Sequence, residues 1–454
     1  MQLPASRYAA VFALRAAPVA AVAATLVALP FAPLALAETV AEAMTRAVAV
    51  NPEIRAAAAN RAATGEAVNQ ARGAYFPTID ATVGRGRETS NNASTRPLGD
   101  QTLNRSEAEV TLSQLLFDTG ATSSQVRRFE ARSEGASHQF ASQSETIGFR
   151  AAQAYLEVMR LRALVDLAAE SVDAHRRTLK LVTLLSVGGA GRQSDVQQVV
   201  ARLAQAESSL FAQQGQYDQA VAGYRHLTGR MPEELTRPDS AAQKLPAELD
   251  QAIAQALAAH PAVLAAQKEV EAAQAEREFS RARLGPRINL ELGVSQNHDL
   301  DGVRGLSAER IAMLRLRYNL FRGGSDEARI REAQLRIDEA AAGLEKARID
   351  VERDVRQAWQ NLKAERMRLP QLALYASTSA EVLEAYRAQF KLGLRSLLDV
   401  LNSENEQFAA RGSHASGEYA VLAGEYRLLA GMGRLLAAMG IALPAEGAPA
   451  QKAQ

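Results

Sequence analysis

The sequence contains two copies of one long pattern, and this internal duplication limits its possible folds more than any other feature. The segment AVNPEIRAAAANRAATGEAVNQARGAYFPTIDATV begins at Ala49, and its counterpart AAHPAVLAAQKEVEAAQAEREFSRARLGPRINLEL begins at Ala258. Pro77 and Pro286 lie 209 residues apart, and the register holds without a gap over the whole segment. Chance similarity between alanine-rich helices would not preserve the spacing of such non-helical landmarks.

Shorter matches extend the duplication towards the end of the chain. LLFDTG matches NLFRGG, and GAGRQSDV matches GLRSLLDV, each pair 204 residues apart. The second copy is therefore five residues shorter between its proline and its phenylalanine. We expect two structural repeats, 38–240 and 241–440, each built as short helix, strand, loop, strand, long helix, turn and helix.

The N-terminus has the pattern of an export signal. Two arginines precede the apolar stretch APVAAVAATLVALPFAPLALA, which ends in the small-residue cleavage motif Ala35-Leu36-Ala37. An uncleaved membrane anchor is the alternative, but two prolines interrupt the stretch and a cleavage motif follows it. We expect residues 1–37 to be a cleaved signal peptide, the mature chain to begin at Glu38, and residues 441–454 to form a flexible tail.

Two segments, 122–185 and 325–392, have the periodicity of very long helices. Apolar residues recur in alternating steps of four and three, which is typical of a coiled-coil seam. Roughly 65 helical residues would span about 100 Å. Pro370 should kink the second helix locally. Asn51-Pro52 and His260-Pro261 predict shorter helices that begin with an N-cap residue and a proline. From the helices alone, a filamentous coiled coil remains an alternative.

Four further segments alternate between apolar and polar residues and predict β-strands. They lie at about 78–84, 107–117, 287–295 and 310–321. Strands of about 9–11 residues with one apolar and one charged face are typical of membrane β-barrels. Four strands cannot close a barrel, since known membrane barrels need at least about eight, so the chain must assemble with copies of itself. A soluble pair of hairpins capping a helical bundle is the alternative.

Composition argues against several classes of function. The chain has 52 basic and 51 acidic residues, which gives no electrostatic reason to expect a nucleic acid partner. It has no cysteine, which excludes disulfides, thiolate metal sites and a lipidated N-terminal cysteine. The sequence contains no phosphate-binding loop and no H-E-x-x-H motif, and its six histidines are scattered. We therefore expect neither a cofactor nor an enzymatic activity.

Taken together, these motifs resemble the TolC-like outer membrane efflux and secretion ducts. The resemblance covers about 38–440 and depends on the N-P helix starts, the paired helix–proline–strand junctions, FDTG with FRGG, and G-x-x-x-x-x-D-V twice. It implies a homotrimer with one twelve-stranded outer membrane barrel and a long α-helical barrel across the periplasm, closed by helix tips. Such ducts are not enzymes, and they dock through a periplasmic adaptor on an inner membrane ABC transporter or proton-driven pump.

The resemblance also implies a gate at the helix tips. The matching positions are an arginine, its hydroxyl partner with an adjacent aspartate, a phenylalanine where the family has tyrosine, a constricting aspartate, and an asparagine where the family has a second aspartate: Arg395, Ser194, Asp195, Phe390, Asp399 and Asn402. An alternative is that Ser194-x-x-Gln197 and Ser396-x-x-Asp399 are capping boxes that only start helices.

Glycines flank these polar residues and suit tight turns between antiparallel helices. They are Gly189, Gly191 and Gly393, and the resemblance places the adaptor contact at the same turns.

Within the family, two roles compete: type I protein secretion and small-molecule efflux. Many efflux ducts carry a lipidated cysteine that this chain lacks, which favours protein secretion. A soluble periplasmic coiled-coil adaptor or scaffold is the alternative from another class.

Overall fold

The computed structural model describes residues 37–443. Ala37 is therefore the only residue of the expected signal peptide within the described part, and Ala35 lies outside it. Of the expected C-terminal tail, only residues 441–443 are described.

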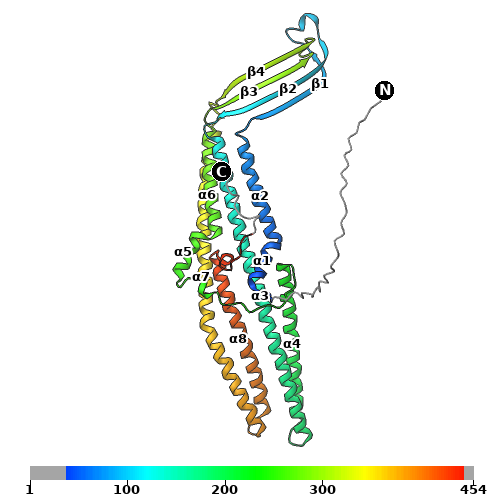
Figure 1. Cartoon of the computed structure of the whole chain (residues 1–454), viewed down its shortest axis with the longest axis vertical. Helices are drawn as coiled ribbons and strands as arrows, with labels where there is room; N and C mark the ends of the chain where they lie inside the picture. The colour runs from blue at the N-terminus through cyan, green and yellow to red at the C-terminus, as the bar shows by residue number, and fades with distance from the viewer. Residues whose placement is uncertain (1–36, 444–454) are drawn as a thin grey trace, which may run out of the picture. The chain divides into compact units, whose positions relative to one another are not determined.

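The described chain repeats one succession of elements, which confirms the duplication (Figure 1). The first succession is α1 Val40–Val50, α2 Pro52–Gly73, β1 Thr78–Ser90, β2 Gln101–Phe117, α3 Ala121–Val187 and α4 Gln193–Thr228, with a 3-10 turn at Arg96–Leu98. The second is α5 Leu249–Ala259, α6 Pro261–Ala282, β3 Arg287–His298, β4 Leu306–Arg317, α7 Ser325–Lys391 and α8 Leu397–Gly431, followed by α9 Leu435–Ala438; a 3-10 turn at Ala242–Lys244 precedes it. Both α3 and α7 contain 67 residues, and both α2 and α6 contain 22.

Corresponding helices begin in the same way in the two repeats. Asn51 caps α2 by accepting a hydrogen bond from the Glu53 backbone N–H at 2.8 Å. His260 caps α6 through Nδ1, which accepts from the backbone N–H of Ala262 at 3.1 Å. A proline follows each cap, where its missing N–H costs no helical hydrogen bond. The capping role expected for both residues is confirmed.

The four strands form one antiparallel sheet in the order β1-β2-β3-β4. Residues directly opposite each other share a face, so the register separates the two faces. One row across the sheet is Ile79, Leu112, Leu292 and Ala312, and a row on the other face is Thr82, Glu109, Ser295 and Glu309. The alternation expected from the sequence is confirmed.

The strand boundaries expected from the sequence were partly wrong. β1 and β2 extend beyond the expected 78–84 and 107–117, and they leave only residues 91–100 to connect them. β4 ends at Arg317, so Tyr318 and Leu320 lie beyond the strand although their alternation continues. Alternation alone cannot show where a strand ends, because a strand also needs a partner. The first residue of β3, Arg287, pairs with Arg317, so residues after Arg317 have no partner on β3.

The FDTG and FRGG motifs are strand-to-helix turns. Thr119 and Gly120 have positive φ angles of 60° and 87°, and Gly323 and Gly324 have 61° and 79°. In the first repeat the Asp118 carboxylate accepts hydrogen bonds from the backbone N–H groups of Gly120 and Thr122, at 3.1 and 2.6 Å. Two consecutive left-handed residues explain why glycine recurs in the motif.

The two helix-to-strand junctions at Pro77 and Pro286 differ in their surroundings. Phe76 is 68% exposed, so few atoms of the chain pack against its ring at the first junction. At the second, a Cβ on Gly285 would lie 2.1 Å from Oγ1 of Thr119, whose hydroxyl donates to the Pro286 carbonyl oxygen at 3.1 Å. Glycine replaces the aromatic residue in the second repeat because the turn of the first repeat lies against it.

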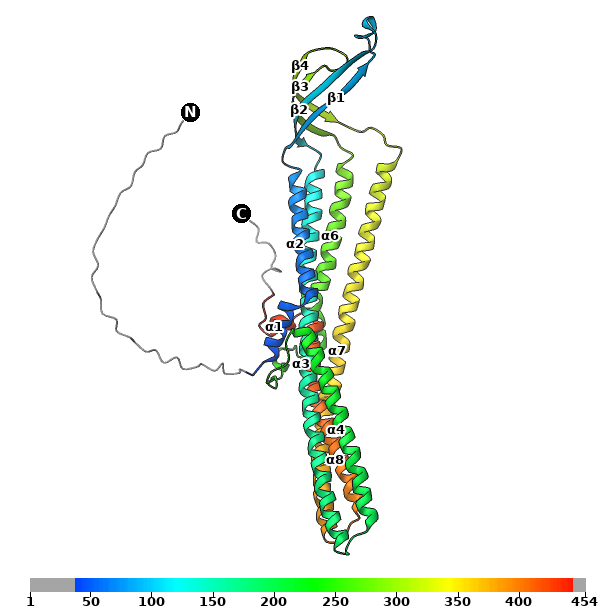
Figure 2. The same ribbon diagram turned by 90° about the vertical axis from the view of Figure 1, so that its right-hand side faces the viewer.

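The long helices pack in pairs, α3 with α4 and α7 with α8, and α3 also contacts α8 (Figure 2). The largest apolar core lies where α1, α3, α4 and α8 meet; its largest buried side chains include Met44, Phe140, Tyr155, Tyr224 and Tyr426. Pro370 lies inside α7, which continues on both sides of it as one helix. Among the described helices, none combines the length and apolarity that a membrane-crossing helix requires.

Candidate functional site at the helix tips

The turns that join the paired long helices have the same backbone geometry in both repeats. Gly189 follows α3 with φ 77°, and Gly393 follows α7 with φ 75°. In each turn the next residue donates back into the helix, from Ala190 to the Leu185 carbonyl at 2.9 Å and from Leu394 to the Gln389 carbonyl at 3.0 Å. This Schellman geometry satisfies the last carbonyls and requires a left-handed residue, which glycine supplies.

A third glycine is required for a different reason. A Cβ on Gly191 would lie 3.0 Å from the backbone nitrogen of Ser186, so the chain passes close to the end of α3 at this point. Apolar side chains surround the two turns and are exposed in the single chain: Leu184, Val187, Leu392 and Leu394.

The two capping boxes expected at the tips have different outcomes. Ser396 caps α8, and its hydroxyl accepts from the backbone N–H of Asp399 at 3.2 Å. The corresponding expectation for Ser194 is wrong, because α4 begins at Gln193 and its N-cap position is Arg192, which makes no side-chain cap. Ser194 and Asp195 instead lie within the first turn of α4, where Asp195 complements the positive end of the helix dipole.

Arg395 is held by residues of its own helix pair. Its guanidinium lies 4.0 Å from the centre of the Tyr386 ring, and its Nε donates to Oε1 of Gln389 at 3.1 Å. A weaker ion pair of 3.8 Å joins it to Asp399. Within one chain, the contacts of the described Arg395 side chain are thus on α7 and α8, and they do not bring it to Ser194 or Asp195.

Phe390 and Asn402 lie between the two helix pairs. Phe390 on α7 packs against a small apolar cluster to which α3, α4 and α8 contribute; its members are Leu179, Val182, Val196, Val199, Leu397 and Leu401. The Asn402 side-chain oxygen accepts a 3.3 Å hydrogen bond from Arg202 on α4. A phenyl ring without a hydroxyl suits this apolar position better than a tyrosine would.

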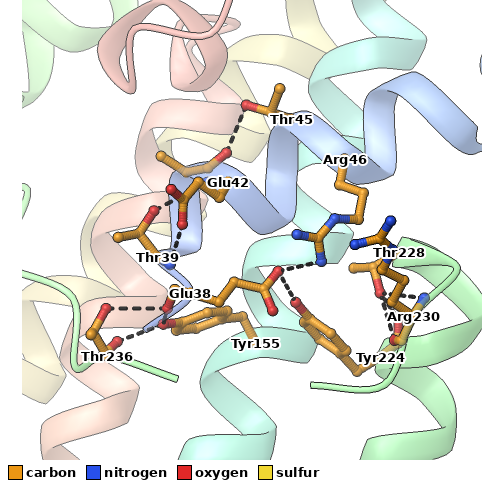
Figure 3. A network of polar contacts seen from close by, with 11 residues as sticks. Glu38, Thr39, Glu42, Thr45, Arg46, Tyr155, Tyr224, Thr228, Arg230 and Thr236 are labelled. Carbon is orange, nitrogen blue, oxygen red and sulfur yellow. Dashed lines mark hydrogen bonds and ion pairs between the residues drawn. The ribbon is translucent and has the colours of Figure 1, made fainter. Parts of the chain in front are cut away.

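A buried polar network around Glu38 was not expected from the sequence (Figure 3). Its carboxylate accepts from Arg46 at 2.8 Å and from the Tyr224 hydroxyl at 2.6 Å. Its backbone carbonyl accepts from the Tyr155 hydroxyl at 2.6 Å and from the backbone N–H of Thr236 at 3.0 Å. One residue thereby connects α1, α3, α4 and the segment after α4.

The network changes the acidity of its tyrosines. Burial raises the pKa of Tyr155, and burial together with the adjacent Glu38 carboxylate raises the pKa of Tyr224 well above its usual range. Both phenols therefore stay protonated and act as hydrogen-bond donors.

Two other carboxylates fix connecting segments to the long helices. Glu425 on α8 is buried and accepts from the Ser240 hydroxyl, the backbone N–H of Ala241 and Arg366, at 2.9, 2.7 and 2.8 Å. It therefore anchors the chain at the expected boundary between the repeats. Glu145 on α3 accepts from the backbone N–H groups of Leu435 and Leu436 at the start of α9. In the sequence, Glu425 and Glu145 occupy polar positions of the heptad pattern, and nothing in that pattern indicates that they are buried.

Within residues 37–443, no group of three or more histidine, aspartate or glutamate side chains is arranged to hold a metal ion. The tips instead combine tight turns, exposed apolar side chains and a few oriented charges.

Comparison with known proteins identifies the family. The family model described as "Outer membrane efflux protein" matches residues 43–230 and 252–434, one segment in each repeat. The outer membrane efflux protein BepC of Brucella suis is 27% identical over 392 residues, covering 86% of this chain and 84% of BepC. The alkaline protease secretion protein AprF of Pseudomonas aeruginosa is 23% identical over 393 residues, covering 82% of this chain and 79% of AprF.

A solved structure supports the fold. The CmeC outer membrane channel of Campylobacter jejuni superposes with a TM-score of 0.77 at 13% identity, covering 87% of this chain and 86% of CmeC. With the family model matching both repeats, the resemblance to the TolC-like ducts is confirmed. The chain therefore belongs to the outer membrane efflux protein family, whose members are TolC-like channels of the outer membrane.

Proposed function

We propose that this protein is a passive exit duct of the outer membrane, formed by three identical chains. The observation that carries the proposal is the four-stranded sheet. β1 and β4 each pair on one side only within the described chain, and an open sheet edge is very costly in lipid. Pairing β4 of one chain with β1 of the next would close a ring of twelve strands in a trimer.

The exposed faces of the sheet support a membrane location. Large apolar side chains share one face and are exposed in the single chain: Ile79, Val83, Val110, Leu292, Val294, Leu314 and Leu316. A contiguous apolar surface of this kind indicates a partner or a lipid phase. The strands, of 12 to 17 residues, are long enough to cross a hydrocarbon core, which takes about 9–11 residues. Export through a cleaved N-terminal signal is part of the proposal.

In the proposed assembly the helices form a periplasmic conduit that ends at the tips. There the turns at Gly189, Gly191 and Gly393 would receive a periplasmic adaptor, and an inner membrane ABC transporter or proton-driven pump would supply the energy. The tip residues Arg395, Asp399, Ser194 and Asp195 would form the gate between neighbouring chains. We propose no enzymatic activity and no cofactor.

Fractionation of cells that produce the protein tests the assembly. We expect heat-resistant trimers in detergent extracts of the outer membrane and ion-conducting pores when they are reconstituted in planar bilayers. Recovery of a monomer from the soluble periplasmic fraction would favour the alternative, a coiled-coil scaffold or adaptor.

For the transported substrate we favour type I protein secretion. The similarity to AprF, named for alkaline protease secretion, and the absence of cysteine from the sequence both support it. Small-molecule efflux is the second candidate, supported by the similarity to the efflux protein BepC. Deleting the gene and comparing secreted proteins with drug susceptibility separates the two. Loss of a secreted protein with unchanged susceptibility is the expected result.

A further inference from the structure

Above the tip turns, one buried carboxylate connects three of the long helices. Glu404 on α8 is 5% exposed. Its Oε1 accepts from Arg387 on α7 at 3.0 Å and from the Thr178 hydroxyl on α3 at 3.2 Å. Its Oε2 lies 3.2 Å from Nδ1 of His175, a residue of α3 that is 1% exposed. α3 belongs to the first repeat, and α7 and α8 belong to the second.

The environment keeps this carboxylate charged. Burial acts to raise the pKa of Glu404, but its contacts with His175 and Arg387 outweigh burial, and the pKa lies below its usual value. Glu404 is therefore ionised near neutral pH, inside the interface between the helix pairs. A buried charge that loses its partner carries a large penalty, because water no longer solvates it.

An ion pair elsewhere also joins α8 to α3, but it is exposed to solvent. Arg411 on α8 contacts Glu170 on α3 at 2.6 Å, and their side chains are 41% and 58% exposed. Both this pair and Glu404 border one groove of about 270 Å³ between the helices. Exposed pairs contribute little to stability, since water screens them. The two contacts thus differ mainly in burial.

Glu404 lies between the tip and the rest of the bundle. It follows Leu401, a member of the apolar cluster around Phe390, by three residues, and it follows Asp399 by five. Apolar contacts can slide, whereas the hydrogen bonds of Glu404 with Arg387 and Thr178 hold only at fixed distances. Moving the α7–α8 pair away from α3 would separate the carboxylate from His175 and Thr178 while Arg387 moved with it.

We propose that Glu404, with His175 and Arg387, is a latch that holds the α7–α8 pair against α3 and keeps the tips of the proposed duct closed. The latch depends on the proposed channel function and adds to it a positioning residue outside the tip itself. It acts within one chain, whereas the proposed tip gate acts between chains.

Single-channel recording of the full-length trimer in planar bilayers tests the latch. Glu404→Gln keeps the shape of the side chain and removes its charge, so we expect a conductance several-fold above that of the natural chain. The matched control, Arg411→Gln, breaks the exposed pair between the same helices and should leave conductance unchanged.

A second variant addresses the possibility that Glu404→Gln does not assemble. His175→Leu combined with Glu404→Leu replaces the two buried polar side chains by apolar ones, a change that buried polar contacts often tolerate, while Arg387 keeps its ion pair with Glu384. This double variant should form heat-resistant trimers and should also conduct more than the natural chain.

Three outcomes are decisive. An assembled Glu404→Gln or double variant with natural conductance overturns the latch, provided that the natural chain forms pores. Equal increases for Glu404→Gln and Arg411→Gln also overturn it, because burial would then not matter. If the natural chain forms no pore, the proposed function fails and the latch fails with it.

Discussion

The hydroxyl of Tyr224 donates a 2.6 Å hydrogen bond to the carboxylate of Glu38, deep in the interface between α1, α3 and α4. Glu38 directly follows the expected cleavage motif, so a residue expected at the very start of the mature chain is among its most firmly held. N-terminal residues are usually poorly ordered unless something ties them down. Here hydrogen bonds to α1, α3, α4 and the segment after α4 hold Glu38 in place.

Tyr224→Phe should destabilise the protein through this single bond. The substitution removes the hydroxyl and leaves Arg46 as the donor to the carboxylate. Losing a hydrogen bond to a charged group lowers the free energy of unfolding by about 1.5–3 kcal/mol. Thermal unfolding followed by circular dichroism measures the change. Tyr375→Phe, at an exposed position on α7, should change it by less than about 0.5 kcal/mol; equal effects would contradict the role of the network.

Glu145 should make stability depend on pH. Burial raises the pKa of its carboxyl from 4.5 to about 7, against the opposing effect of the Leu435 and Leu436 N–H groups. The folded state therefore binds the proton more tightly than the unfolded state, and stability falls as pH rises from about 4.5 to about 7. We expect the unfolding midpoint to be lower at pH 8 than at pH 5.5. Glu145→Gln should reduce this difference, and an unchanged pH dependence would exclude Glu145 as its source.

Gly285→Ala should strain the contact between the repeats. The new Cβ would overlap Thr119, and such overpacking costs about 1–3 kcal/mol. Adding Thr119→Gly should restore stability, since it removes the overlapping atoms and also suits the positive φ of that residue. Gly73→Ala provides the opposite control, because no atom lies within 4 Å of its Cβ position and alanine is favoured in a helix. If Gly285→Ala leaves stability unchanged, the junction accommodates the added methyl group without strain.

Asp399→Asn should alter ion selectivity without disturbing the helix start. The cap of α8 uses the Ser396 hydroxyl and the backbone N–H of residue 399, neither of which the substitution removes. In the proposed trimer the three carboxylates form a ring that favours cations. The reversal potential across a salt gradient should therefore shift towards lower cation preference. Ser396→Ala serves as the comparison, since it weakens the cap and leaves the charge.

Arg395→Ala together with Asp195→Ala should raise single-channel conductance. Within one chain the two residues are not in contact, so a combined effect on conductance requires contacts between neighbouring chains. If Arg395 acts only through Tyr386, Gln389 and Asp399, the substitutions will lower the stability of the tip and leave conductance unchanged.

Local patterns in the sequence were sufficient to predict most of the fold. The duplication marked by Pro77 and Pro286 predicted the order of the elements, and the glycine turns and heptads predicted the extent of the long helices, because turns and heptads depend on a few neighbouring residues. The strand boundaries were predicted less well, since they depend on pairing with other strands. Ser194 was mistaken for a cap because the S-x-x-Q pattern fits, whereas the helix begins at Gln193. Pattern alone does not show which residue leaves helical geometry first.

The buried carboxylates could not be predicted in this way. Glu38, Glu404 and Glu425 each meet partners from other elements. Arg387 and Thr178 lie 17 and 226 residues from Glu404, and the partners of Glu38 lie up to 198 residues away. In sequence they look like the solvent-exposed charges of ordinary helices. Their burial follows from how distant elements pack, within the first repeat for Glu38 and between the repeats for Glu404, and local patterns contain no information about that packing.

The pairing of β2 with β3 joins the second strand of one repeat to the first strand of the next. In the proposed trimer, β4 and β1 of neighbouring chains would meet in the same way, so the twelve strands would form six nearly equivalent hairpins although only three chains are present. The ring would depart from sixfold symmetry where the repeats differ, as in the close contact of Gly285 with Thr119 and the shorter connection between β3 and β4. Those differences would give a partner protein a means of telling one repeat from the other.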